Sequence, residues 1–448
     1  MVLSIFMGGA TIAQTKKVLV ENGEMLVGTA RVDITPRTPI RLAGYASRGA
    51  NETDKIIHRL EAKALAFGSD VQQPSILLTV DLVGIPKDIT DNLVETLAKE
   101  INIDASRVAI CASHTHGGPE VGNLLNILQA RKEGFSDSLL SSGHLQHIAL
   151  YTEELKKKLV QVSLEALTNR KPSLVSWGQG KVGFAKNRRT EGGPVDHAMP
   201  LLKVTDTKGE LQAVLVNYAC HATTIGGVNQ IYGDWISEAK ITIEERHPGA
   251  MAMVAIGCGG DSNPFPRGQM KQMRAYGKQI ADETERLLAQ QLEPITEPPK
   301  GKIKTVELPF AHVPSISELI QQSKENSIKG YYSRLALYRV LRGETIPSKL
   351  SYQVQVWTFG KQMVMVNLPG EVVVDYALRL KKELGPKTLW VNAYSNDAPS
   401  YIASRRVIEE GGYEAEDSMY WYNKPSSYMP EIEDIIVEAV HDLLRSGL

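Results

Sequence analysis

Beyond residue 25, short apolar runs alternate with helical patterns, and this alternation constrains the fold more than any other feature of the chain. Several of the runs are apolar throughout rather than at every second residue, which is typical of strands covered on both faces. The strand candidates are 75–80, 107–112, 211–218, 251–256, 362–367 and 388–393. The helical patterns are 86–101, 150–169, 236–246, 268–291, 315–342, 371–384 and 430–446. The alternation predicts an α/β fold with layered mixed sheets and flanking helices.

Composition and charge exclude several classes of protein. Hydrophobic residues make up 42% of the chain and charged residues 23%, which is ordinary usage for a soluble chain that forms a core. Fifty Lys and Arg against 51 Asp and Glu give a net charge of -1, so no basic face for nucleic acid or anionic membranes is expected. Three cysteines without a CxxC pair form neither a disulfide framework nor a cysteine-only zinc site. No apolar run reaches the roughly 18 to 20 residues that span a bilayer, so no transmembrane segment is predicted.

The N-terminal segment has features of a signal peptide. Residues 2–13 are apolar, and Thr11 and Ala13 fit the small-residue rule for cleavage just after Ala13. No Lys or Arg precedes the run. We expect residues 1–13 to be a signal peptide and the protein to be exported to the periplasm or secreted; the alternative is an N-terminal strand or tail in a cytoplasmic protein.

Polar residues and glycines directly follow five of the predicted strands. These segments are 113–119, 219–223, 257–264, 368–371 and 394–397. In open α/β sheets, binding sites form beyond the carboxyl ends of strands, because the loops there converge on one crevice. We therefore expect one site built from segments that are distant in sequence.

The pair His114 and His116 is the strongest single indication of chemistry. In an extended segment, residues two apart project to the same side, so both imidazoles can face one pocket. A third imidazole from His221 and a carboxylate from Glu371 would provide the nitrogen and oxygen ligands that zinc accepts, with a position left for water. A single histidine is more commonly a core or surface residue, but this spacing beside glycines at a strand end favours a metal site.

The turn at 257–264 has two interpretations. Its glycines can cradle an oxyanion with backbone N–H groups, or they can serve a tight turn that needs positive φ. It is neither a Walker loop nor a GxGxxG motif, and Ser262 is not in a GxSxG nucleophile elbow. Three cysteines at strand ends are predicted to be small buried packing residues near the site: Cys111, Cys220 and Cys258.

A series of short segments continues from these motifs along most of the chain. They are Asp33-Ile34-Thr35-Pro36, Gly44-Tyr45-Ala46, His58-Arg59-Leu60, His114 to Pro119, Asn187-Arg188, His221-Ala222-Thr223, Leu368 to Glu371, Ser400-Tyr401-Ile402 and Tyr413-Glu414. Their order over roughly residues 28–420 resembles the neutral/alkaline non-lysosomal ceramidase family.

The resemblance implies a zinc-dependent hydrolase that cleaves the N-acyl amide bond of a ceramide-like or other lipid amide by metal-activated water. It implies one Zn²⁺ per chain, with these ligands: His114, His221, Glu371 and Tyr401. His116 and Tyr413 match residues that hold the substrate carbonyl, and Arg188 is a looser match near it. The general base stays open between the second oxygen of Glu371, Asp261 and His116.

Two departures from the family pattern bear on the substrate. Aligned on Pro264, the family's serine falls on Asn263, and Ser262 is displaced by one residue; Asn263 can still donate a hydrogen bond. The chain also ends about 35 residues after Tyr413, without room for the family's C-terminal β-sandwich domain. Two alternatives therefore stand beside the ceramidase-like amidase. One is a related metallohydrolase for another ester, lactone or amide, and the other is a non-catalytic metal- or lipid-binding homologue.

The implied ligands also bear on domain organisation. Residues 292–302, with three prolines and a glycine, form the best linker candidate, yet the ligands lie on both sides of it. We therefore expect one large catalytic domain over 25–448, with this proline-rich connection inside it. The near-zero net charge fits a neutral small-molecule or lipid amide as the partner, and no nucleic acid.

Overall fold

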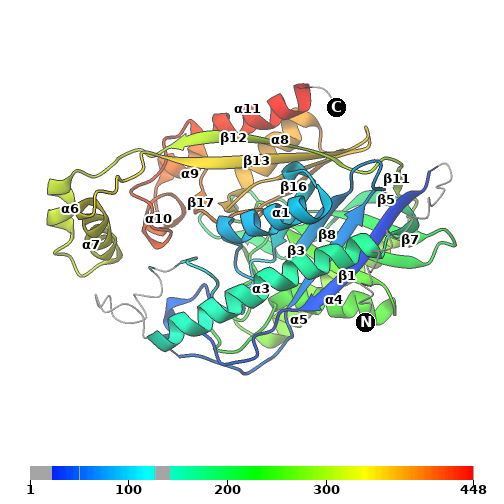
Figure 1. Cartoon of the computed structure of the whole chain (residues 1–448), viewed down its shortest axis with the longest axis horizontal. Coiled ribbons are helices and arrows are strands. Elements are labelled where there is room, and N and C mark those ends of the chain that lie inside the picture. The colour runs from blue at the N-terminus through cyan, green and yellow to red at the C-terminus, as the bar shows by residue number, and fades with distance from the viewer. Residues whose placement is uncertain (1–22, 50, 126, 128–141, 447–448) are drawn as a thin grey trace, which may run out of the picture.

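Two sheets lie face to face, and helices cover the outer face of each (Figure 1). The structure is a computed structural model that describes residues 23–49, 51–125, 127 and 142–446. The α/β fold with layered mixed sheets and flanking helices is confirmed. The predicted signal peptide at 1–13 lies outside the described residues.

The larger sheet has nine strands within the described residues, in the order β4-β3-β2-β1-β5-β7-β8-β9, with β11 paired to β5. They are β1 (Met25–Asp33), β2 (Glu61–Phe67), β3 (Ser75–Val80), β4 (Val108–Ala112), β5 (Lys171–Lys181), β7 (Ala198–Asp206), β8 (Leu211–Tyr218), β9 (Met251–Ile256) and β11 (Glu293–Ile295). Only β3–β4 and β8–β9 are parallel among these described pairs, and they form the two ends of the sheet.

The second sheet has the order β12-β13-β14-β16, and its β14–β16 pair is parallel. Its strands are β12 (Lys300–Pro309), β13 (Lys349–Phe359), β14 (Met363–Asn367) and β16 (Leu389–Asn392). Two small ladders stand apart from the sheets: antiparallel β6 (Ala185–Asn187) with β10 (Ser262–Pro264), and parallel β15 (Glu371–Val372) with β17 (Tyr401–Ile402).

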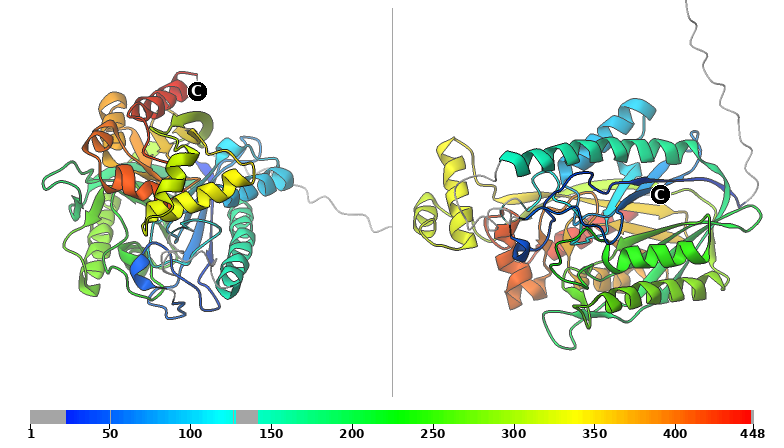
Figure 2. Two further views of the ribbon diagram at one scale, coloured as in Figure 1. Left: turned by 90° about the vertical axis from the view of Figure 1, so that its left-hand side faces the viewer. Right: turned by 90° about the horizontal axis from the view of Figure 1, so that it is seen from below.

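The helices fall into three groups. The helices α1 (Lys87–Ile101), α4 (Asp234–Arg246) and α8 (Val374–Leu384) each connect the two strands of a parallel pair. Other helices of the outer layers are α3 (Ser142–Thr168), α5 (Met270–Leu288) and α11 (Ile432–Arg445). At one end of the molecule, α6 (Ile316–Gln322) and α7 (Ile328–Leu341) form a projecting hairpin (Figures 1 and 2), and α9 (Arg405–Glu410) and α10 (Ser418–Trp421) flank a π-helical turn at Tyr413–Asp417. No helix in the described ranges is both long and apolar enough to cross a bilayer.

The core explains why several strands are apolar throughout. In β3, Leu77 packs between the sheets with Trp357 and Trp390, whereas its neighbours Ile76 and Leu78 pack in the cluster that contains the helices. Successive side chains of a strand point to opposite faces, and both faces of this strand are buried. The predicted two-sided burial is therefore confirmed for β3.

Beyond shifts in the ends of individual helices, such as α3, which begins at Ser142 rather than at 150, three sequence-based assignments differ from the structure in kind. The helix predicted over 315–342 is two helices, because the Ser327 side chain caps a new helix by accepting from the N–H of Gly330. The pattern at 371–384 begins with the short strand β15, and the helix starts at Val374. The proline-rich stretch 292–302 is not a free linker, since it contains β11 and the start of β12 and connects one sheet to the other.

The segment after β16 joins the two ends of the larger sheet. The N–H of Ala393 donates to Ile256 of β9 at 2.9 Å, and the carbonyl of Tyr394 accepts from Ala112 of β4 at 3.0 Å. The N–H of Asn396 then donates to Ile110 of β4 at 2.8 Å. These bonds hold the carboxyl ends of β4, β9 and β16 together, which is where the polar residues follow.

Candidate metal centre

Backbone pairing brings the predicted ligands to one place. The loops after β4 and β8 meet in a parallel bridge between Thr115 and Ala222, which are the neighbours of His114 and His221. Glu371 and Tyr401 are partners in the parallel ladder β15–β17. The segments predicted to form one site therefore lie together, and the positions of the candidate ligands depend on pairing between loops as well as on strand ends.

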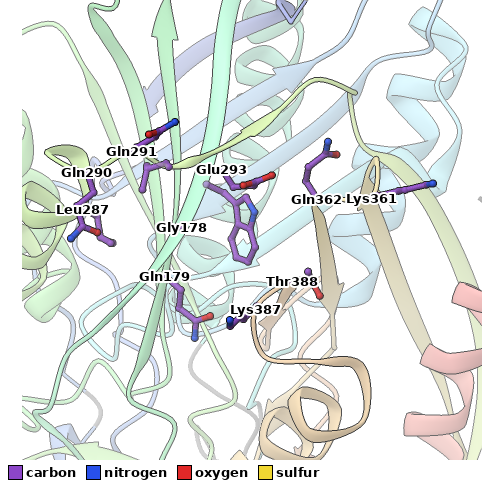
Figure 3. A pocket seen from close by; sticks show the side chains of 12 residues that line it. Gly178, Gln179, Leu287, Gln290, Gln291, Glu293, Lys361, Gln362, Lys387 and Thr388 are labelled. Atoms are coloured by element: carbon purple, nitrogen blue, oxygen red, sulfur yellow. The ribbon is translucent and has the colours of Figure 1, made fainter.

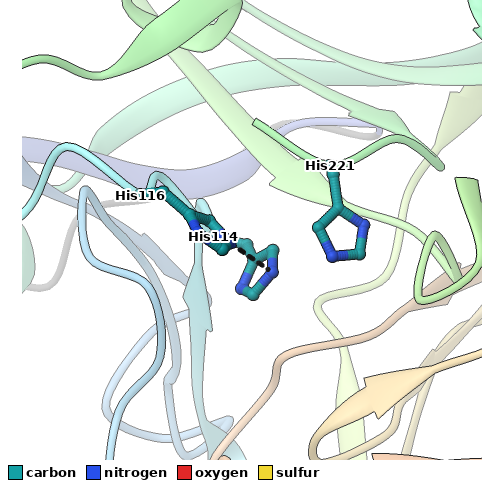
Figure 4. A group of neighbouring side chains, drawn as sticks. All are labelled: His114, His116 and His221. Carbon is teal, nitrogen blue, oxygen red and sulfur yellow. Dashed lines mark hydrogen bonds between the residues drawn. The ribbon is translucent and has the colours of Figure 1, made fainter. Parts of the chain in front are cut away.

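Two imidazoles point at one carboxylate oxygen. The Nε2 atoms of His114 and His221 each lie 3.2 Å from Oε2 of Glu371, and the histidines are 1% exposed. Figure 4 shows the rings of His114 and His116 in contact and His221 opposite them. The candidate ligand nitrogens of these three histidines lie within 4.8 Å of one another.

Backbone carbonyls determine where the ligand histidines carry their protons. Nδ1 of His114 donates to the carbonyl of Val83 at 2.6 Å, and Nδ1 of His221 donates to that of Gly259 at 2.7 Å. A neutral imidazole with its proton on Nδ1 presents a lone pair at Nε2. Such bonds to the second nitrogen orient metal-binding histidines in general.

The donor set fits a cation. Oε2 of Glu371 is buried and accepts no hydrogen bond. In the neutral tautomer, the two Nε2 lone pairs face this oxygen with no proton between them, which is unfavourable unless a positive charge lies there. The residues present therefore suit a metal such as zinc.

The pKa values of the site reflect burial and neighbouring charge. Burial, followed by Arg188 and His114, lowers the pKa of His221 to about 4, so this imidazole is neutral at pH 7. Burial also lowers the pKa of His116 well below its usual value. The imidazoles of His221 and His116 therefore carry no positive charge at neutral pH that would oppose a cation.

The histidine pair converges for a different reason than expected. His114 has a φ of 53°, so the segment is not extended there, and positive φ is uncommon for a residue with a side chain. The turn brings Nε2 of His116 to 3.2 Å from Nε2 of His114. A Cβ at Gly44 would lie 2.2 Å from Nδ1 of His116, so only glycine leaves space for this ring.

Arg188 lies beside the predicted tyrosine ligand. Its guanidinium donates to the Tyr401 hydroxyl at 3.0 Å and to Glu414 at 2.7 Å, and it lies 3.4 Å from Nε2 of His221. Burial raises the pKa of Tyr401 well above its usual value, although Arg188 opposes this effect. The ring of Tyr413 lies 5.6 Å from that of Tyr401 and is 45% exposed, at the edge of the site.

Tyr422 also belongs to the centre, although no sequence motif predicts it. The Tyr422 hydroxyl donates a short hydrogen bond to Oε1 of Glu371, the oxygen that does not face the histidines. The only sequence signal was an aromatic run at 420–422, which is equally typical of packing. Hydrogen bonding to Oε1 leaves Oε2 directed at the two Nε2 atoms.

The centre opens into a pocket of about 210 Å³. His116, Glu371 and Tyr401 form its inner part. The other lining residues are mostly aromatic, apolar or small: Gly44, Tyr45, Ala46, Ser47, Val83, Leu125, Tyr413, Trp421 and Tyr422. A small molecule or part of a larger one can therefore reach the candidate ligands past an aromatic wall.

Asp261 and Asn263 are not among the described residues that line this pocket. Asp261 is fully buried; one oxygen accepts from the N–H of Val374 and the other from Asn187, both at 2.9 Å. Asn263 lies in β10 opposite Lys186. The structure thus makes Asp261 a residue that holds the turn against α8, and a part for Asn263 in the reaction stays a prediction.

The glycine-rich turn is required for close packing. A Cβ at Gly260 would lie 2.6 Å from the carbonyl oxygen of Glu371, and one at Gly259 would lie 2.8 Å from the nitrogen of Cys220. Neither glycine has positive φ. The expectation of a positive-φ turn is wrong for these two, since their role is to let the backbone approach the ligand segments.

The three cysteines are free and buried, as predicted. Burial raises the pKa of Cys111 to about 11, and it raises the pKa of Cys220 and Cys258 as well. Thiols with raised pKa values are poor nucleophiles. These side chains pack beside the site.

A larger pocket, of about 690 Å³, lies elsewhere (Figure 3). It adjoins the β13–β14 turn at Lys361 and Gln362 and the start of β16 at Thr388, at the opposite ends of β14 and β16 from the histidines. Its lining contains no histidine, and its polar side chains do not converge on a common point (Figure 3). The smaller pocket is therefore the candidate site, because His116, Glu371 and Tyr401 of the candidate centre line it.

The fold and donors define an α/β protein with a buried candidate metal centre. The sequence matches the family described as neutral/alkaline non-lysosomal ceramidase, N-terminal, over residues 25–283, more than half of the chain, and the chain belongs to this family.

Two solved structures share the fold. A neutral ceramidase from Pseudomonas aeruginosa is 17% identical with a TM-score of 0.71, and the match covers 95% of this chain and 75% of that one. A structure described as ceramidase complexed with C2 is 16% identical with a TM-score of 0.71, and the match covers 94% and 76%. No curated protein sequence matches the chain.

Proposed function

We propose that this protein is a zinc-dependent hydrolase that cleaves the N-acyl amide bond of a ceramide-like or other lipid amide. Membership of the ceramidase family supports the reaction class. The observation that carries the metal is the group of two Nε2 atoms and one carboxylate oxygen, buried and facing one another without protons between them.

In this proposal one Zn²⁺ binds His114, His221, Glu371 and Tyr401. A bound zinc ion supplies Lewis acidity, which polarises an amide carbonyl and lowers the pKa of water. Arg188, half-buried and charged beside Tyr401 and His221, stabilises negative charge that develops next to them. The hydroxyl of Tyr413, at the edge of the pocket, donates a hydrogen bond to the substrate oxygen.

The hydrogen bonds favour one of the three candidate bases. Oε1 of Glu371 already accepts from Tyr422, and both oxygens of Asp261 accept protein donors. His116 lines the pocket, has a buried Nδ1 without a hydrogen-bond partner and is neutral at pH 7. We assign proton transfer to His116, next to the role of holding the substrate carbonyl.

The size of the pocket favours a second candidate function, with a smaller substrate. Sites for drug-sized ligands occupy roughly 300 to 1,000 Å³. About 210 Å³ holds the scissile group and a short acyl chain more readily than a long lipid. A metallohydrolase for a short-chain amide, ester or lactone is therefore the alternative, and an acyl-chain series with matched esters distinguishes the two.

Metal analysis with His114→Ala tests the function. We expect the candidate centre of the purified protein to hold one equivalent of zinc and the protein to hydrolyse N-acyl amides, and His114→Ala to lose this equivalent together with the hydrolysis. The control is His312→Ala, which removes an exposed imidazole that pairs with Glu318. Amide hydrolysis that survives in His114→Ala, or a zinc-free protein that gains no activity on adding zinc, would disprove the proposal.

We also propose that the protein is exported and that residues 1–13 are its signal peptide. Cleavage after Ala13 makes Gln14 the first residue of the mature protein, which N-terminal sequencing of the protein expressed from its full-length gene detects.

A further inference from the structure

A second group of metal-type donors lies outside the candidate centre. Oε1 of Glu52 lies 2.5 Å from Nδ1 of His144 and 2.9 Å from Nδ1 of His147. The histidines belong to the first turns of α3, and Glu52 belongs to the loop before β2. None of the three residues lines the pocket of the candidate centre.

The arrangement is preorganised by the helix. Residues three apart lie on one face of a helix, so both imidazoles of α3 project to the same side. Their Nδ1 atoms converge on a single carboxylate oxygen from a different part of the chain. The side chains are 17% to 36% exposed, so a cation can reach them from solvent.

The chemistry of the group selects the kind of cation. Two imidazoles and one carboxylate suit zinc and its neighbours in the first transition row, whereas magnesium and calcium prefer oxygen ligands. Hydrogen bonds from the two imidazoles outweigh the effect of burial and lower the pKa of Glu52, so it is ionised at neutral pH. A neutral imidazole that binds a metal through Nδ1 carries its proton on Nε2 instead, so binding needs a change of tautomer and no co-reactant.

We propose that Glu52, His144 and His147 form a second, accessory site for zinc or a similar divalent transition metal. The three protein ligands leave the remaining coordination positions to water. The cation replaces the two imidazole–carboxylate hydrogen bonds and cross-links α3 to the loop that carries Glu52.

The accessory site lies in the same connection as part of the pocket wall of the candidate centre. Tyr45, Ala46 and Ser47, which line the pocket of the candidate centre, lie a few residues before Glu52 in the same connection. A cation at Glu52 therefore restrains the wall of that pocket from a distance. The accessory site supports the wall and takes no part in bond cleavage.

Calorimetric titration of the metal-stripped full chain with Zn²⁺ tests the proposal. We expect the wild type to bind two equivalents and His144→Ala/His147→Ala to bind one. His312→Ala, which removes a single exposed imidazole paired with Glu318, is the matched control and should bind two. Circular dichroism checks that each variant is folded, and Glu52→Gln, which removes a charge without removing an imidazole, should weaken the second binding event at least tenfold.

The same experiment separates this site from the candidate centre. A His114→Ala/His221→Ala variant should keep one equivalent, and adding His144→Ala/His147→Ala should abolish binding. Two results would disprove the accessory site. One is an unchanged stoichiometry in folded His144→Ala/His147→Ala protein. The other is a single equivalent in the wild type that only the His114→Ala/His221→Ala change removes. The second of these results would leave the proposed function intact.

Discussion

Glu371 and Tyr422 show how a single hydroxyl directs a ligand. The carboxylate has two oxygens of equal chemistry, yet only Oε1 accepts a protein hydrogen bond, from Tyr422. The other oxygen is left for the two imidazoles at 3.2 Å. Partners behind a ligand of this kind fix its orientation and contribute to metal affinity.

At the residue scale we expect Tyr422→Phe to weaken zinc binding by about 10- to 100-fold, because Glu371 loses the bond that orients it. Amide hydrolysis should fall at limiting zinc and return when excess zinc is added, since the hydroxyl acts through the ligand. Competition with a chromogenic chelator measures the affinity. Tyr420→Phe, whose ring packs on Tyr332, is the control, and an equal loss in that variant would contradict a specific role for Tyr422.

At the scale of elements, the start of α4 holds the loop that carries His221. Asp234 is fully buried, has a φ of 55°, and accepts from the N–H groups of Thr224 and Trp235 at 2.8 Å each. The indole N–H of Trp235 in turn donates to the carbonyl of His221 at 3.0 Å. The position of one ligand therefore depends on a strained and buried helix terminus.

Asp234 should make stability depend on pH. Burial raises its pKa to about 6 in the folded protein, above the usual value of 3.8 expected for the unfolded chain. The folded state therefore holds the proton more tightly, and the free energy of unfolding falls as pH rises from about 4 to 6 and then levels off. We expect Asp234→Asn to remove this contribution, so that its stability relative to wild type increases over this range by up to about 3 kcal/mol.

Urea unfolding of the metal-stripped proteins at several pH values measures the difference. Asparagine tolerates positive φ, so the substitution changes the charge more than the backbone. Asp88→Asn, at an exposed position on α1, is the control and should follow the wild type. Parallel stability curves for Asp234→Asn and wild type would contradict the prediction.

At the scale of the whole molecule, a buried network of amides joins the two sheets. Asn217 of β8 donates to Asn392 of β16 at 2.7 Å, and Asn392 donates to Asn367 of β14 at 2.8 Å. Asn367 and Asn396 both donate to the side-chain oxygen of Gln355 on β13. Buried polar networks with every member paired favour one arrangement of the core over others.

We expect Asn392→Leu to lower the free energy of unfolding by about 2 to 5 kcal/mol, because several buried partners lose their hydrogen bonds at once. The loss should extend to zinc retention, since the segment after β16 closes the end of the molecule that holds the ligands. Asn92→Leu, on the exposed face of α1, should change stability by no more than about 0.5 kcal/mol. Denaturant unfolding checks both, and a neutral Asn392→Leu would show that the network does not hold the sheets together.

The sequence by itself determined the elements whose pattern is local. The runs at 75–80, 211–218 and 251–256 match β3, β8 and β9 to the residue, because strands buried largely on both faces are mostly apolar. Most strands of the antiparallel part escaped prediction. In β5, for example, buried and partly exposed residues alternate and two glycines interrupt the pattern.

The residues of the candidate centre could be predicted from the sequence, but some of their contacts could not. The histidine pair, together with the order of motifs, singled out seven residues that the structure brings to one place: His114, His116, Arg188, His221, Glu371, Tyr401 and Tyr413. It also singled out Asp261, whose buried contacts with Asn187 and Val374 no local pattern reveals.

Only the tertiary structure decided how these donors face one another. The carbonyls that hold protons on Nδ1 and the hydroxyl of Tyr422 on Glu371 come from segments 31 to 51 residues away in the sequence, and the positive φ at His114 lies in the same centre. A sequence pattern records which groups are present and which face of an element they occupy. Which oxygen or nitrogen keeps an unused lone pair depends on every neighbour in space, and the fold assembles those neighbours from distant parts of the chain.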